Sequence, residues 1–191
     1  MKDFKIVDMN LETDKPQLNS WQELYGETDE YKAIEHYILE DHMIYDLGEV
    51  VETNYEIVPI GDNEIKKALV AKTNEDEIVG FILCQAFDLQ TNLPEIFLQY
   101  VVINPSYQHQ GYGKAIFTEF FSNPRKYLGL SKNHKKPHYV FSFIHTTNES
   151  SKALYKSFGF DISKEMKPHS MVRATATLPE LEKVINSKTL N

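Results

Sequence analysis

A short segment with two closely spaced glycines has the residue types needed to bind a phosphate group: Gln108-His109-Gln110-Gly111-Tyr112-Gly113-Lys114. Glycine lets the backbone approach a ligand closely, and the first amides of a helix that follows such a turn point outward. These amides can hold a pyrophosphate without any charged side chain. An ordinary tight turn explains the same two glycines equally well, so the segment alone leaves both interpretations open.

The segments on either side predict a strand that runs into this turn and a helix that leaves it. Residues 95–103 are rich in β-branched and aromatic side chains, and residues 115–121 carry apolar side chains at helical spacing. The glycines therefore stand at the N-terminus of a helix, where a phosphate site is expected.

A second motif, Asn-x-x-(Ala/Ser)-x-x-Leu-Tyr-x-x-x-Gly-Phe, spans residues 148–160. In their order and separation, the two motifs together resemble the GCN5-related N-acetyltransferase (GNAT) superfamily. The resemblance covers about residues 65–163. It implies transfer of an acetyl group from acetyl-CoA to an amine, and it leaves a longer acyl donor open. The alternative is a non-catalytic module with a GNAT-like fold that binds CoA or a partner protein.

Strand and helix patterns along the chain predict an α+β fold, in one domain that spans residues 1–191. The resemblance implies a mixed, mostly antiparallel sheet of about seven strands with helices on both faces. It also implies that strand 95–103 splays from strand 138–145 and leaves a V-shaped cleft for acetyl-CoA. Acceptor-side helices are expected at about 17–50, the acetyl-CoA-binding core at about 65–163, and a C-terminal strand and helix at about 168–188.

Each element has an expected position. The strands are residues 5–8, 65–72, 77–87, 95–103, 138–145, 160–163 and 171–175. Helices are expected at residues 28–48, 115–121 and 148–158, with two more beginning near residues 17 and 177, and residues 122–137 are expected to form a loop.

The resemblance also implies which residues hold acetyl-CoA. Backbone groups of Val101, Val102 and Ile103 would pair with the pantetheine arm like an added strand. The amides of the glycine turn would hold the pyrophosphate, from Gln108, His109, Gln110, Gly111, Tyr112, Gly113 and Lys114. Asn148 would hydrogen-bond the pantetheine or its neighbouring backbone, and Ser151 would supply the small side chain needed for close approach.

Amine attack on a thioester needs a neutral amine, a polarised carbonyl and a proton for the leaving thiolate. By resemblance, Tyr155 matches the family tyrosine that lies near the CoA sulfur and can give it that proton. A backbone N–H near Val101 or Val102 would polarise the carbonyl oxygen. A tyrosine on an amphipathic helix is also typical of plain core, and this second interpretation of Tyr155 stays open.

The general base is the least defined part of the predicted site. Some histone-type members carry a glutamate where this chain has Phe97, so that assignment fails here. Glu95 and Gln99 flank Phe97 and are expected on one strand face, because side chains alternate with period 2. Glu95 is the candidate base, acting through a water, or else an exposed residue at the start of the strand. His145 is a second candidate, with a structural role as its alternative.

Acidic residues gather in the N-terminal third of the chain. Residues 12–56 hold thirteen acids against two lysines, a net charge of −11, whereas residues 123–173 hold ten bases against three acids, a net charge of +7. In the family, the N-terminal helices form the acceptor wall. We therefore expect a cationic small-molecule or peptide amine, such as a polyamine, an aminoglycoside-like amine or a basic peptide end. The candidate contacts are Glu35, Glu40, Asp41 and Asp46.

Overall composition restricts the remaining function classes. The formal net charge of −8 argues against a general affinity for nucleic acid, which needs a basic surface. No apolar run approaches the roughly 20 residues of a membrane helix, and the first residues lack a signal-peptide core.

The single cysteine excludes an internal disulfide, so the cytoplasm is the expected location. The histidines lack metal-ligand spacing, so no metal is expected. Homodimers are common in the family, so a homodimer is a further expectation.

Overall fold

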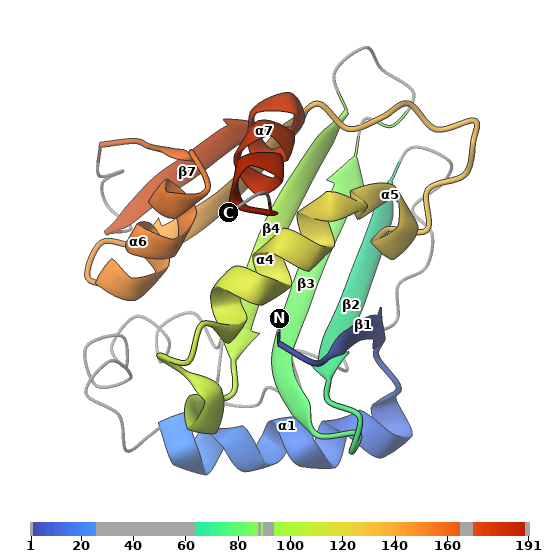
Figure 1. The fold of residues 1–191 in the computed structure, drawn as a ribbon, viewed down its shortest axis with the longest axis vertical. Helices are drawn as coiled ribbons and strands as arrows, with labels where there is room; N and C mark the ends of the chain where they lie inside the picture. The colour runs from blue at the N-terminus through green and yellow to red at the C-terminus, as the bar shows by residue number, and fades with distance from the viewer. Residues whose placement is uncertain (1, 26–63, 88, 90–93, 165–169, 190–191) are drawn as a thin grey trace.

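A seven-stranded mixed sheet forms the centre of the fold (Figure 1). The structure is a computed structural model that describes residues 2–25, 64–87, 89, 94–164 and 170–189. The strands are β1 (Lys5–Asp8), β2 (Ile65–Lys72), β3 (Ile78–Phe87), β4 (Glu95–Ile103), β5 (Tyr139–His145), β6 (Asp161–Ile162) and β7 (Met171–Thr177). They lie in the order β1-β2-β3-β4-β5-β7-β6, and only β4 and β5 pair in parallel within the described ranges. This confirms the mostly antiparallel α+β fold expected from the sequence.

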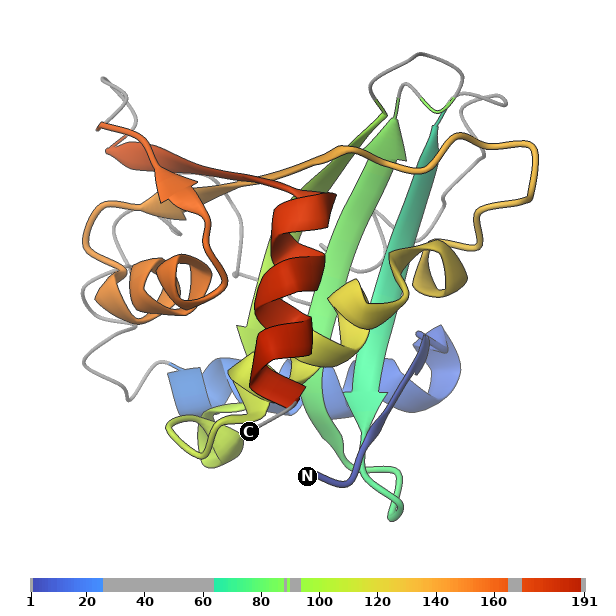
Figure 2. The ribbon, with the colours of Figure 1, turned by 45° about the horizontal axis from the view of Figure 1, so that its top comes forward.

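Helices pack on both faces of this sheet (Figures 1 and 2). They are α1 (Leu11–Tyr25), the 3₁₀ turn η2 (Pro105–Tyr107), α4 (Tyr112–Ser122), α5 (Pro124–Tyr127), α6 (Glu149–Ser157) and α7 (Leu178–Thr189). One face packs against α4, α6 and α7 in a cluster that includes Phe117, Tyr155 and Leu181. The other face packs against α1 through Leu18 and Trp21. Burial of these two apolar clusters is the main force that holds the layers together.

The first helix begins earlier than the sequence pattern indicates. We expected it from about residue 17, whereas α1 begins at Leu11. Asn10 and Asp14 cap its start: the Asn10 side chain accepts the N–H of Glu12, and the Asp14 carboxylate accepts the N–H of Asn10. These bonds satisfy amides that a helix start otherwise leaves unpaired.

A loop at residues 122–137 and a helix at residues 28–48 were also expected from the sequence. The connection at residues 122–137 begins with the short helix α5, because the Asn123 side chain accepts the N–H of Lys126 and caps it. The helix expected at residues 28–48 lies outside the described residues.

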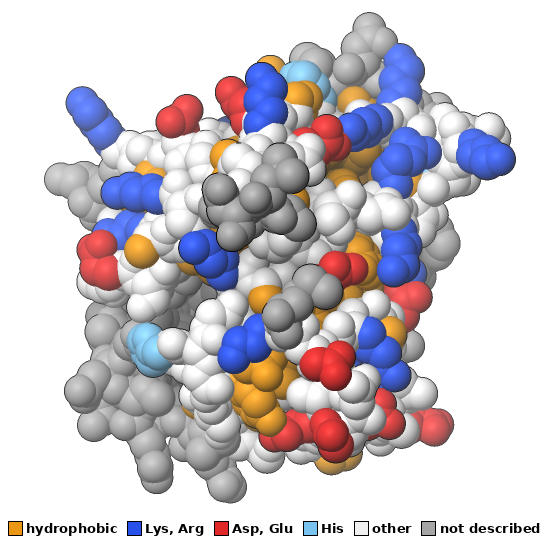
Figure 3. Space-filling view, in the orientation of Figure 1, with side chains coloured by type: hydrophobic (Ala, Val, Ile, Leu, Met, Phe, Trp, Pro, Cys, Tyr) orange, Lys and Arg blue, Asp and Glu red, His pale blue; other side chains and the backbone are white. Residues whose placement is uncertain are grey.

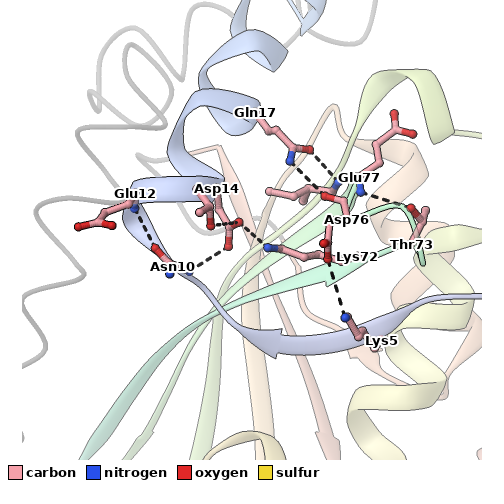
Figure 4. A network of polar contacts seen from close by, with 11 residues as sticks. Lys5, Asn10, Glu12, Asp14, Gln17, Lys72, Thr73, Asp76 and Glu77 are labelled. Carbon is pink, nitrogen blue, oxygen red and sulfur yellow. Dashed lines mark hydrogen bonds and ion pairs between the residues drawn. The ribbon is translucent and has the colours of Figure 1, made fainter.

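A polar network attaches α1 to the turn between β2 and β3 (Figure 4). Asp14 is 1% exposed and forms an ion pair with Lys72 of β2. Gln17 of α1 accepts the N–H of Ile78 at 3.0 Å and donates to the carbonyl of Asp76 at 3.1 Å. The charge of Asp14 is therefore buried with a partner, and this pair fixes how α1 lies across the sheet.

Loss of the Asp14 charge should destabilise the whole fold. We expect Asp14→Asn to lower the free energy of unfolding by about 3 kcal/mol, because Lys72, whose side chain is only 12% exposed, loses its counter-ion. Urea denaturation measures this change. Glu12→Gln removes an exposed acid from the same helical turn and should change stability by less than about 0.5 kcal/mol. Equal losses of unfolding free energy in both variants would show that the Asp14–Lys72 ion pair contributes no more than an exposed acid does.

Candidate active site

The cleft begins where β4 and β5 stop pairing. Their parallel ladder covers only Glu95–Phe97 opposite Tyr139–Phe141, although β4 continues to Ile103 and β5 to His145. Figure 2 shows the orange and red C-terminal strands leaving the green β4 at a wide angle. Beyond Phe97, the edge of β4 that faces away from β3 has no strand beside it in the described part of the chain. The splay implied by the resemblance is present.

A serine closes the vertex of this V, which we define as Phe97 and Leu98 on β4 with Phe141 and Ser142 on β5. Ser142 is 3% exposed, and its hydroxyl donates to the carbonyl of Leu98 at 2.8 Å. This bond joins the strands at the point where their ladder ends. Ser142 was not predicted as a site residue. Its only signal in the sequence is that it is the one polar residue between Val140 and Ile144.

Tyr155 reaches the vertex from α6. Its ring lies edge-on to Phe117 and Phe160, with centroid distances of 5.0 and 4.9 Å. Burial raises the pKa of the Tyr155 hydroxyl well above its ordinary value, and a hydrogen bond with the Ser142 side chain opposes this shift. The ring is thus part of the core while the hydroxyl lies beside Ser142 at the vertex, and the role of Tyr155 as proton donor stays a prediction.

The start of α6 is shaped by Asn148. Its side chain accepts the N–H of Ser151 at 2.9 Å and so caps the helix, while the N–H of Asn148 donates to the carbonyl of His145 at 3.0 Å. Asn148 therefore joins the end of β5 to α6, the helix that carries Tyr155.

The segment that leads into the glycine turn is held in place by Asn104, four residues before Gln108. Asn104 is buried, donates from its side chain to the carbonyl of Ile78 at 3.1 Å, and accepts the N–H of Ser106 at 3.0 Å. His109 and Gly111 have positive φ angles of 56° and 85°, so the backbone curls before α4 begins. Asn104 therefore holds the backbone that leads into the turn and, like Ser142, was not predicted from the sequence.

The first amides of α4 are available to a ligand. The N–H groups of Gly111, Tyr112, Gly113 and Lys114 donate to no other group in the described part of the chain, as expected at a helix start. Gln108 differs, because its N–H already donates to the carbonyl of Pro105 at 3.2 Å. The amides without a protein acceptor therefore lie toward the glycines of the segment, and their binding of an anion stays a prediction.

Gly113 also matters for packing, because it has no side chain. A Cβ at this position would lie 3.4 Å from Leu154 and 3.6 Å from Ile103. The absence of a side chain lets α4 come close to both α6 and the end of β4.

A β-bulge interrupts β4 just beyond the vertex. Leu98 pairs with Cys84 and Tyr100 pairs with Leu83, so Gln99 is the extra residue. The bulge shifts the alternation beyond it, so Tyr100 and Val102 pack against the cluster of Leu18 and Trp21, whereas Val101 and Ile103 pack with Leu98 on the other face.

The sequence profile of the acetyltransferase (GNAT) domain matches residues 64–162, which is more than half of the chain. The chain belongs to the GNAT acetyltransferase family. Membership confirms the resemblance found from the two motifs and implies acyl-CoA-dependent N-acetyltransferase activity in general. Acetyl-CoA is the acyl donor of this family. A search of curated protein sequences finds no significant match.

Solved structures share the GNAT fold over nearly the whole chain. An acetyltransferase from Thermus thermophilus has a TM-score of 0.62 at 17% identity, covering 92% of this chain and 97% of that one. The spermidine N-acetyltransferase from Vibrio cholerae in complex with CoA and spermine has a TM-score of 0.57 at 10% identity, covering 94% and 98%. The ribosomal-protein-S18-alanine N-acetyltransferase from Escherichia coli has a TM-score of 0.57 at 16% identity, covering 92% and 94%. Identities this low show the fold alone.

The remaining predicted residues of the GNAT site lie apart from the vertex or outside the described ranges. Glu95 stands at the start of β4 opposite Tyr139, within the paired part of the strands. His145 stands at the far end of β5. The four acceptor acids, Glu35, Glu40, Asp41 and Asp46, lie outside the described residues. A role as general base or acceptor contact remains a prediction for all of them.

Charge is unevenly distributed over the surface of this GNAT protein. Figure 3 shows basic side chains gathered near α5 and the connection that follows it, and acidic side chains near α1 and the β2–β3 turn. The basic residues of α5 and this connection are Arg125, Lys126, Lys132, Lys135 and Lys136.

Within the described ranges, no group of three or more His, Cys, Asp or Glu side chains could hold a metal ion. None of the helices described is long and apolar enough to cross a membrane.

Proposed function

We propose that this GNAT protein transfers the acetyl group of acetyl-CoA to the primary amine of a cationic acceptor, directly within a ternary complex. The observation that carries the proposal is the position of the Tyr155 hydroxyl. It lies at the vertex where β4 and β5 part, beside Ser142, and burial raises its pKa. A protonated hydroxyl held there can give a proton to a leaving thiolate.

Two features of the chain fit acetyl-CoA. The amides of Gly111 to Lys114 would hold the pyrophosphate at the start of α4. The open edge of β4, at Val101, Val102 and Ile103, would pair with the pantetheine arm as an added strand would. Bound acetyl-CoA supplies an acetyl group already activated as a thioester.

Each of the reacting groups then has a candidate partner in the chain. A backbone N–H of Val101 or Val102, next to the bulge, would polarise the thioester carbonyl. Tyr155 would protonate the thiolate as it leaves. Glu95 would accept the amine proton through a water, because it lies in the paired part of β4 and not at the vertex.

Direct transfer agrees with the chemistry of Cys84. This cysteine is buried within β3, and burial raises the pKa of its thiol to about 12. A thiol of this kind stays protonated at neutral pH and makes a poor nucleophile. The amine itself is therefore the group that we expect to attack the thioester.

Support for a cationic acceptor comes from the charge distribution. The acids concentrate in residues 12–56, where the family has its acceptor wall. A GNAT protein of the same fold, from Vibrio cholerae, was solved with CoA and spermine. Glu35, Glu40, Asp41 and Asp46 would be the acceptor contacts.

A panel of neutral, monocationic and polycationic amines tests the proposal, with release of the free thiol from acetyl-CoA as the readout. We expect faster turnover of polycations at low salt and a loss of that preference as salt screens the attraction. Equal rates for neutral and cationic amines would contradict the cationic acceptor. If CoA raises the melting temperature but no amine releases thiol, the protein is a CoA-binding module.

A further inference from the structure

An arginine stands on the face of the sheet opposite α4 and α7, beside a group of aromatic rings. We call Phe97, Phe141, Phe143 and Arg173 the aromatic face. Phe97 stacks on Phe141 with centroids 4.9 Å apart, and Phe143 lies edge-on to both. Their neighbours along β5 and β7, such as Val140 and Val172, point into the core on the other side. The aromatic face therefore lies outside the main core of the sheet.

The guanidinium of Arg173 lies over the ring of Phe141, with its carbon 4.5 Å from the ring centroid. Its Nε is buried and has no hydrogen-bond partner among the residues that the structure describes. Among the described residues, no carboxylate forms an ion pair with this side chain. The stacked guanidinium therefore carries a positive charge that no described carboxylate balances, and a charge held in this way can bind an anionic group of a ligand.

The position of Arg173 links it to the reaction. Phe141 is the last residue of β5 that pairs with β4, and Arg173 pairs with Phe143 two residues further along. The guanidinium thus lies next to the vertex, on the opposite face from the side that Tyr155 occupies. An acceptor amine has to reach this same vertex to attack the thioester.

The chemistry of the guanidinium specifies what it binds. A planar arginine fork matches a planar carboxylate, and stacking on Phe141 holds the fork in one orientation. The terminal nitrogens are the donors that a ligand would use, because the Nε is covered. A carboxylate bound there would lie only a few bonds from an amine at the vertex.

We propose that Arg173 binds a carboxylate of the acceptor, so that the enzyme selects a basic amino acid over the corresponding diamine. This inference rests on the proposed function and narrows its acceptor class. In the reaction, the acceptor nitrogen forms the bond to the acetyl carbon and the carbon–sulfur bond breaks. The nitrogen loses one proton and the thiolate gains one, while the carboxylate only binds.

Amine pairs that differ by one carboxylate test the proposal. Lysine is compared with cadaverine, and ornithine with putrescine, by thiol release from acetyl-CoA. We expect kcat/KM at least tenfold higher for each amino acid, mainly through a lower KM. Arg173→Met keeps an apolar stem over Phe141 and should remove the preference by raising KM for the amino acids only. Arg173→Lys keeps the charge and should retain part of it.

Thr175→Val is the matched control, because Thr175 is the next residue on the same face of β7 and carries no charge. It should keep the wild-type preference. Three results would overturn the role of Arg173 and leave the acetyltransferase proposal intact. They are equal kcat/KM for both members of each pair, turnover of other amines only, and a loss of kcat/KM in Arg173→Met that is the same for all amines. Absence of thiol release with every amine would instead overturn the proposed function itself.

Discussion

Replacing Tyr155 with phenylalanine is expected to lower kcat for acetyl transfer by about 100-fold or more, because the variant loses the proton donor for the leaving thiolate. The ring contacts with Phe117 and Phe160 remain, so the fold should be little changed. Steady-state kinetics by thiol release measures kcat, and a thermal shift with CoA checks that cofactor binding survives.

The pH profile gives a second test of the same residue. Because burial raises the pKa of Tyr155, its hydroxyl stays protonated above the pH at which an exposed tyrosine ionises. Ionisation of Tyr155 should therefore cause no loss of kcat on the alkaline side below about pH 10. A fall in kcat near neutral pH that disappears in Tyr155→Phe would contradict this assignment.

Tyr127→Phe is the matched control for Tyr155→Phe. Tyr127 is also buried and stacks on Phe120, but its hydroxyl bonds Glu119 away from the vertex. We expect wild-type kcat from this variant. Ser142→Ala should fall between the two, with kcat about tenfold lower, because it removes the group that orients the Tyr155 hydroxyl. Unchanged kcat in Tyr155→Phe would show that the tyrosine is only core.

Gly111→Val is expected to weaken CoA binding by about 100-fold or more, because charge-assisted hydrogen bonds from the amides of α4 to the pyrophosphate would be lost. Gly111 has a φ of 85°, a region that a β-branched residue strongly disfavours. A Cβ added at Gly111 would have no heavy atom of the described residues within 4 Å. The protein itself therefore leaves this space open, and the loss should concern the ligand. Isothermal titration with CoA measures the affinity.

Gly129→Val controls for the backbone strain. Gly129 follows α5 and has a φ of 66°, so valine there carries a similar penalty far from the start of α4. Its CoA affinity should equal that of the wild type even if its melting temperature falls. Retained affinity in Gly111→Val, or equal losses in both variants, would refute the pyrophosphate assignment.

Much of the fold could be predicted because the signals are local. Strands β2, β4 and β5 show β-branched and aromatic runs, and α6 shows a capping Asn148 before an amphipathic repeat. Gly111 is a residue that tolerates positive φ, and the structure places it at such an angle just before α4. These features depend on a few neighbouring residues, so they can be recognised in the sequence itself. The start of α1 differs from the expected one although its cap is local, because Pro16 lies inside the helix, where local rules disfavour proline.

The two motifs in the sequence determined the family and with it the class of donor, an acyl-CoA, whereas the tertiary structure decided which side chains meet at the site. Ser142 bonds Leu98, which is 44 residues earlier in the chain, and Tyr155 joins them from a helix. The bulge at Gln99 and the stacking of Arg173 on Phe141 likewise depend on strand register and strand order. The physical reason is that periodicity and turn chemistry act between near neighbours, while the vertex forms only when distant segments pack into one sheet.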